Sequence, residues 1–187
     1  MTEPAPAPDL EAVPEDWTRA LAVVAHPDDL EYGTASAVAR WTEQGKEIAY
    51  CLVTSGEAGI DTIAPDECAR VRQEEQRRSG TAVGVDVVEF LAHPDGMVEA
   101  SIPLRRDLAA AIRRHRPEVV ISINFRETFG MPGFNHVDHR ETGVALLEHR
   151  GVHPRPPAPG PGDERVGPHG DVGGLVRPRL DDPSRRP

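Results

Sequence analysis

The chain has 187 residues, a formal net charge of −10 at pH 7 and two cysteines. The acidic balance argues against a phosphate-binding face for nucleic acid or for an anionic membrane, and two cysteines are too few for a disulfide framework. No run approaches the roughly 18 apolar residues of a membrane span, and no basic patch and apolar stretch open the chain. The sequence therefore predicts a cytoplasmic protein without a nucleic-acid or membrane partner.

Composition divides the chain into three parts. Residues 1–16 are rich in proline, alanine and acids, and residues 151–187 hold 16 proline or glycine residues among 37, without apolar periodicity. Such segments bury too little apolar surface to fold, so we expect both to be disordered tails. Residues 17–150 are expected to form one compact domain.

Strands and helices are predicted to alternate along this domain. Short apolar runs indicate strands, and helical spacing with capping residues indicates helices. In chain order we expect a strand at 21–25, a helix at 30–44, a strand at 47–54, a helix at 65–79, a strand at 85–91, a helix at 103–115, a strand at 118–123 and a helix at 139–149. This alternation predicts an α/β fold, a Rossmann-like, mostly parallel sheet with helices on both faces.

Two clusters of chemically active side chains follow predicted strands. His26, Asp28 and Asp29 come directly after the first strand, and a second group at 135–139 follows the fourth. Ligands of open α/β sheets bind beyond the carboxyl ends of the strands, so the clusters are expected to meet. Taken separately, the first could be an ordinary turn in which Asp29 caps a helix, and the second could hold unconnected surface histidines.

Together the clusters predict a mononuclear zinc site. A catalytic zinc ion takes three nitrogen or oxygen ligands from the protein and keeps one position for water, whose pKa falls to about 7. His26, Asp29 and His139 supply such a set.

The remaining polar residues of the clusters suggest acid–base roles. Asp28 lies beside the ligands and is expected to act as general base. His136 is expected to polarise the substrate carbonyl or to protonate the leaving group, with Asp138 orienting its ring.

Three further segments carry weaker signals. The His-Pro-Asp-Gly run at 93–96 lacks a second acid, and we interpret it as a structural or substrate-loop turn without metal. Alternating acids and arginines at 67–78 are typical of a solvated helix face, although one arginine could reach a substrate. The loop at 55–59 lacks the glycine spacing and lysine of a phosphate cradle; its Glu57 is a candidate for binding a polar substrate.

The chain resembles the LmbE/PIG-L family of zinc-dependent N-deacetylases in three motifs: Ala25-His-Pro-Asp-Asp, Thr54-Ser-Gly-Glu-Ala-Gly and Asn135-His-Val-Asp-His-Arg. The resemblance spans roughly residues 21–150. It implies a Rossmann-like sheet and hydrolysis, by metal-bound water, of the N-acetyl group of an amino-sugar conjugate or a related small N-acylated molecule.

The resemblance also implies a role for six residues of the two clusters. They are the zinc ligands His26, Asp29 and His139, the general base Asp28, the histidine His136 that assists the transition state, and its acidic companion Asp138. Val137 stands where the family often has proline.

The resemblance ends near residue 150. Family members continue with further strands and helices, whereas this chain continues with the tail at 151–187. Lys46 is the single lysine among 21 basic residues, a bias typical of GC-rich codons, and such DNA read out of frame encodes mostly proline, arginine, glycine and alanine. We hypothesise that a frameshift replaced the true C-terminal part; a genuine disordered extension is the alternative. An intact reading frame, with no other frame encoding strands, would contradict the frameshift.

Two other functions are weighed against N-deacetylation. A catalytically impaired remnant or a binding module of the same fold would keep the residues without the activity. A phosphoester hydrolase is less favoured, because its two-metal sites need more acidic ligands than these clusters supply.

Overall fold

The structure, a computed structural model, describes residues 12–129, 133–149 and 175–176. Its parallel strands are β1 (Arg19–Val24), β2 (Glu47–Leu52), β3 (Val87–Phe90) and β4 (Val119–Ile121). Strand order is β3-β2-β1-β4-β5, in which β5 (Leu175–Val176) pairs antiparallel with β4. The predicted parallel α/β sheet is confirmed.

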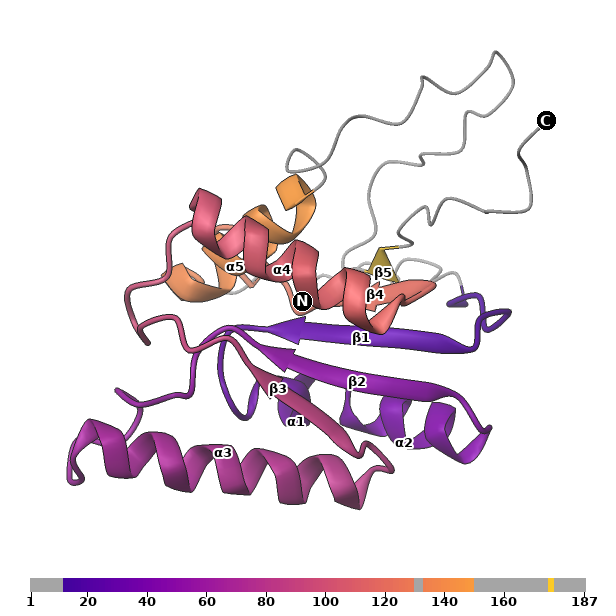
Figure 1. Cartoon of the computed structure of the whole chain (residues 1–187), viewed down its shortest axis with the longest axis horizontal. Helices are drawn as coiled ribbons and strands as arrows, with labels where there is room; N and C mark the ends of the chain where they lie inside the picture. Colours follow the sequence, from indigo (N-terminus) through magenta and orange to yellow (C-terminus); the bar gives the residue numbers. More distant parts are fainter. Residues whose placement is uncertain (1–11, 130–132, 150–174, 177–187) are drawn as a thin grey trace, which may run out of the picture.

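Helices cover both faces of this sheet (Figure 1). One face carries α1 (Asp29–Gly33), α2 (Ala35–Glu43) and α3 (Pro65–Ala82), and the other carries α4 (Ile102–His115) and α5 (Val137–Glu148). Every strand-to-strand connection among β1 to β4 therefore passes through helix, as expected of parallel strands.

Strand β1 lies between β2 and β4 in the sheet, and it is buried on both faces because helices cover each face. Ala22 and Val24 belong to the core beneath α1 and α2, whereas Leu21 and Val23 belong to the core beneath α4 and α5. Side chains of a strand alternate between the two faces, so a doubly covered strand is apolar at every position. This burial fixes the point from which the loop carrying His26 starts.

The helix expected at 30–44 is divided in two. Thr34, with φ −131°, lies between α1 and α2; its N–H closes α1 on Leu30 O at 2.8 Å, and its C=O accepts from Val38 N–H at 2.9 Å. The break separates the short helix that begins at Asp29 from the helix whose Val38 packs on the sheet.

The described part of the N-terminal segment packs on the domain, which differs from the disordered tail expected up to residue 16. The Glu15 carboxylate accepts a hydrogen bond from Trp41 Nε1 at 3.0 Å, and Trp17 Nε1 donates to Pro14 O at 2.9 Å. Composition alone gave no sign of these contacts.

At the other end of the chain, β5 lies within the segment expected to be disordered, although it contributes only two residues to the sheet. Residues 1–11, 150–174 and 177–187 lie outside the described residues, and so does most of the expected C-terminal tail. Among the helices that the structure describes, none combines the length and the apolar character needed to cross a bilayer. The cytoplasmic location stays a prediction.

Candidate metal centre

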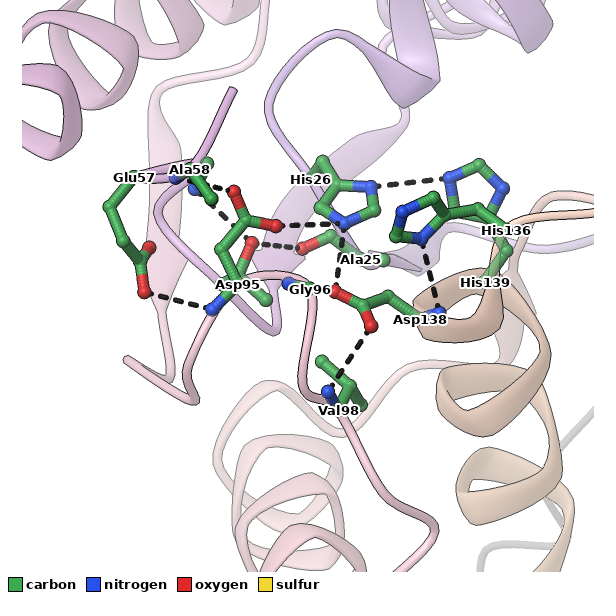
Figure 2. Close-up of polar contacts among 12 residues, drawn as sticks. Ala25, His26, Glu57, Ala58, Asp95, Gly96, Val98, His136, Asp138 and His139 are labelled. Carbon is green, nitrogen blue, oxygen red and sulfur yellow. Dashed lines mark hydrogen bonds and ion pairs between the residues drawn. The ribbon is translucent and has the colours of Figure 1, made fainter. Parts of the chain in front are cut away.

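The two clusters predicted from the sequence meet at the carboxyl edge of the sheet (Figure 2). His26 lies in the loop after β1, Asp29 is the first residue of α1, and His139 lies in the first turn of α5. Figure 2 shows the two histidines facing each other. His26 Nδ1 lies 3.2 Å from His139 Nε2, and His139 Nε2 lies 3.0 Å from Asp29 Oδ1. His26 Nδ1 and Asp29 Oδ2 are 3.8 Å apart. The fold thus closes a separation of 113 residues between the two histidines.

These three side chains fit a zinc ion. Ligand atoms about 2.0–2.1 Å from a tetrahedral zinc ion lie roughly 3.4 Å apart, close to the distances within this group. The ring nitrogen facing away from the group has its own partner in each histidine: His139 Nδ1 lies 2.9 Å from Asn135 Oδ1, and His26 Nε2 lies 3.1 Å from Asp138 Oδ2. Such partners fix the tautomer that directs the lone pair of the other nitrogen at a metal.

The carboxylate of Asp138 contacts His26, although the sequence predicted that it would orient His136. His26, His136 and Asp138 do form a second group whose potential ligand atoms all lie within 4.8 Å of one another. However, Asp138 Oδ2 also accepts from Gly96 N–H at 2.7 Å, and its Oδ1 accepts from Val98 N–H at 3.1 Å. These amides draw the carboxylate toward the loop after β3.

The hydrogen bond between His136 and Asp138 uses the backbone N–H of Asp138, and orientation of the His136 ring by the Asp138 carboxylate stays a prediction. His136 Nδ1 accepts the N–H of Asp138 at 3.2 Å, so its side chain caps α5. The helix begins at Val137, two residues before its predicted start at 139. Histidine is not among the usual N-cap residues, so no recognisable capping residue marked this start in the sequence.

Asp95 belongs to the site, although its His-Pro-Asp-Gly turn was interpreted as a turn without metal. Asp95 Oδ1 lies 3.1 Å from His26 Nε2, and its Oδ2 accepts from Ala58 N–H at 2.8 Å. His93 of the same turn points elsewhere and pairs with Asp107 at 2.9 Å. The repeated His-Pro-Asp pattern at a strand end was the available signal, but the aspartate and not the histidine reaches the site.

Glu57 connects two loops at the edge of the site. Its Oε1 accepts from Asp95 N–H at 2.8 Å, and its Oε2 accepts from Ser55 N–H at 3.3 Å. Both oxygens of Glu57 are thus engaged by backbone amides of the loops after β2 and β3. Figure 2 shows the contact with Asp95. The substrate contact expected of Glu57 stays a prediction beside this loop-bridging role.

Asp28 has an unusual backbone conformation. Its φ of 91° and ψ of −20° lie in the left-handed region, which costs on the order of 1–3 kcal/mol for a residue other than glycine, although aspartate tolerates it better than most. Arg72 Nη2 contacts Asp28 Oδ2 at 2.7 Å and donates to Pro27 O at 2.6 Å. Arg72 is thus turned toward the protein, which differs from the solvated face expected of α3.

Tight packing holds the loop that precedes α5. Asn135, the partner of His139, donates through Nδ2 to Asn124 O at 2.8 Å and to Arg126 O at 3.0 Å. A Cβ at Gly143 would overlap the ring of Phe125. The glycine therefore lets this loop lie directly on α5, next to the helical turn that carries His139.

Neighbouring charges shift the ionisation of two of the proposed ligands. Burial by itself lowers the pKa of His26, but hydrogen bonding and charge attraction from Asp29, followed by Asp138 and Asp95, outweigh it and raise that pKa from 6.5 to about 9. For Asp29, burial raises the pKa, and the two histidines outweigh it and lower the pKa far below its usual range. Without metal, the site therefore holds a protonated His26 beside an ionised Asp29 at neutral pH.

We expect zinc affinity to rise about tenfold per pH unit until the pH approaches 9, and then to level off, because His26 must lose a proton to bind metal. The raised pKa also stabilises the metal-free fold: this contribution, about 3 kcal/mol, is complete below pH 6.5 and is lost as the pH rises through about 9. Zinc titrations against a competing chelator, and urea unfolding of metal-free protein across this range, measure the two effects. An affinity that does not change with pH would contradict the raised pKa.

The fold and the site together define a class of protein: a parallel α/β domain with a His/Asp metal-type centre at the carboxyl ends of its strands. Residues 21–149 match the family described as PIG-L: GlcNAc-PI de-N-acetylase. The chain belongs to this family, which confirms the family resemblance noted in the sequence.

Three proteins illustrate what the chain is similar to. Diacetylchitobiose deacetylase of Thermococcus kodakarensis is 28% identical over 135 residues, which are 71% of this chain and 49% of that protein. The structure of N,N'-diacetylchitobiose deacetylase from Pyrococcus horikoshii superposes with a TM-score of 0.65 and 27% identity, over 74% of this chain and 51% of that one. The structure of the 4-carboxy-2-hydroxymuconate hydratase GalB from Pseudomonas putida superposes with a TM-score of 0.63 and 26% identity, over 81% of this chain and 62% of that one.

The matched region makes up a smaller fraction of each similar protein than of this chain. The chain spans about half the length of both deacetylases and 62% of the hydratase. The part that matches the family, residues 21–149, includes the whole His/Asp centre, which lies between residues 26 and 139.

Proposed function

We propose that the protein is a zinc-dependent amide hydrolase that removes the N-acetyl group from an amino-sugar conjugate or a related small molecule. The observation that carries this proposal is the convergence of His26, Asp29 and His139 in a member of the PIG-L family, with Asp28 next to them in the chain. Relatives that are named as deacetylases of diacetylchitobiose support the substrate class.

The chain's own residues divide the work of amide hydrolysis. His26, Asp29 and His139 would hold the metal ion, and Asp28 would accept a proton from the attacking water and pass it to the leaving nitrogen. His136 donates a hydrogen bond to the acyl oxygen as negative charge develops on it. The C–N bond breaks, and the products are acetate and the free amine.

Zinc would supply Lewis acidity to this site, lowering the pKa of water and polarising the acyl oxygen. Asp138 and Asp95 would keep the His26 ring in place through Nε2. Carboxylate partners of this kind typically raise metal affinity by about 10- to 100-fold.

Likeness to the hydratase GalB favours one second candidate, the addition of water to a carbon–carbon double bond. The two structures match over 81% of this chain, so the fold by itself does not decide between the two reactions. Both reactions activate water, but only N-deacetylation releases acetate. A protein that binds zinc and turns over neither substrate class would instead be the impaired remnant or binding module.

Acetate release decides between these functions. Protein loaded with zinc is incubated with N,N'-diacetylchitobiose and with N-acetylglucosamine conjugates, and acetate and free amine are quantified. A parallel sample receives 4-carboxy-2-hydroxymuconate, whose hydration is followed by the loss of ultraviolet absorbance. Acetate that appears in proportion to bound zinc supports the proposal; absorbance loss without acetate would replace it with the hydratase.

A further inference from the structure

One ridge of α3 faces the protein and not solvent. Residues spaced four apart lie on the same side of a helix, and here they are Cys68, Arg72, Gln76 and Gly80. Cys68, Gln76 and Gly80 are buried, and the Arg72 side chain is 20% exposed. A buried glutamine on such a ridge requires hydrogen-bond partners for both ends of its amide.

Both partners of Gln76 belong to the segment that carries the proposed general base. Gln76 Oε1 accepts the backbone N–H of Asp28 at 3.0 Å, and Gln76 Nε2 donates to Glu31 Oε1 at 2.9 Å. The side chain is 2% exposed. An apolar residue would be enough to fill the space between α3 and α1. The glutamine at position 76 therefore indicates a role in binding the backbone N–H of Asp28.

That backbone needs support, because Asp28 lies in the left-handed region with φ 91°. Its C=O accepts the N–H of Glu31 at 3.1 Å, within the start of α1. Its own N–H, pointing the other way, bonds to Gln76. The left-handed conformation is therefore fixed from both sides, by α1 and by α3.

We propose that Gln76 is a positioning residue for the reaction. It holds the strained backbone of Asp28 through the N–H of that residue, and thereby fixes where the Asp28 carboxylate, which contacts Arg72 at 2.7 Å, leaves the loop next to the proposed ligand Asp29. The inference rests on the proposed function in so far as Asp28 is the general base. Among the described residues, Gln76 forms side-chain hydrogen bonds with Asp28 and Glu31 and with none of the three proposed metal ligands, so its effect is expected on turnover and not on metal binding.

The variant Gln76→Met keeps the length of the side chain and removes both hydrogen bonds. We expect kcat for acetate release to fall about 10- to 100-fold, because small displacements of a catalytic group have effects of this size. KM and zinc content are expected to stay unchanged. The matched control is Gln73→Met, one turn away on α3, which loses a bond to Ser55 Oγ and is expected to keep kcat within about threefold.

Two further variants separate positioning from a general loss of stability. In the Asp28→Asn background, Gln76→Met is expected to lower kcat no further, because the group that it positions is already gone. Gln76→Glu keeps the acceptor for Asp28 N–H but faces Glu31. Adding Glu31→Gln restores a donor–acceptor pair, so the double variant Gln76→Glu, Glu31→Gln is expected to recover activity that Gln76→Glu loses.

Specific outcomes would overturn the inference. An equal loss of kcat in Gln76→Met and Gln73→Met, an undiminished loss in the Asp28→Asn background, or no recovery in the double variant would each show a merely structural role. Should the wild-type protein release no acetate, the proposed function fails, and amide hydrogen exchange still tests the contact. Exchange at Asp28 N–H must then be faster in Gln76→Met than in Gln73→Met, and equal rates would refute the inference.

Discussion

Replacement of Asp29 with alanine is expected to remove bound zinc and all measurable N-acyl hydrolysis. Asp29 Oδ1 lies 3.0 Å from His139 Nε2, so the substitution deletes one of three proposed ligands. Its Oδ2 also accepts the backbone N–H of Ala25 at 3.1 Å and of His26 at 2.9 Å. The same change therefore loosens the loop that carries a second ligand. Zinc per chain after dialysis, measured by mass spectrometry, reports the loss directly.

The matched control for this experiment is Asp86→Ala. Asp86 is exposed and lies directly before β3, at the amino ends of the strands and thus opposite to the site. It is expected to keep wild-type zinc content, which separates loss of a ligand from loss of any carboxylate. Retention of zinc by Asp29→Ala, with unchanged affinity, would remove Asp29 from the metal site.

Asp28→Asn is expected to lower kcat by about 10²- to 10⁴-fold while zinc content stays the same. Positioned general bases contribute rate factors of this size, and asparagine cannot accept the proton. Asparagine also tolerates the left-handed backbone of residue 28, so the fold of the loop is preserved. Steady-state acetate release and zinc analysis on the same sample give both quantities.

An exposed carboxylate on the same side of the sheet provides the control for this second substitution. Asp66 lies in the first turn of α3, and Asp66→Asn is expected to keep the wild-type rate. A wild-type kcat in Asp28→Asn would mean that another group takes the proton. Asp95 is then the next residue to test, because its carboxylate is 7% exposed and contacts His26.

Much of the fold follows from local patterns in the sequence. Continuous apolar runs identify β1 and β2, because a strand covered on both faces has no polar side. The rule that ligands lie beyond the carboxyl ends of parallel strands then predicts that His26 and His139 meet. These inferences depend on periodicity and topology, which a single sequence displays.

The contacts that the sequence did not reveal depend on where loops lie in space. The Asp138 carboxylate accepts from the amides of Gly96 and Val98, which lie about forty residues earlier in the chain. Asp95 follows β3, two strands away from β1, and no local pattern shows that its loop reaches His26. Side-chain partners across loops are set by tertiary packing, and sequence spacing does not encode them.

Asp138 gives protein engineers a practical constraint. Its buried carboxylate receives the amides of Gly96 and Val98 and also contacts His26. Exchange of the segment around Gly96 is therefore expected to move the Asp138 carboxylate and, through it, the ring of the proposed ligand His26. Libraries built on this scaffold should vary that segment and position 138 together, and should measure metal binding before activity.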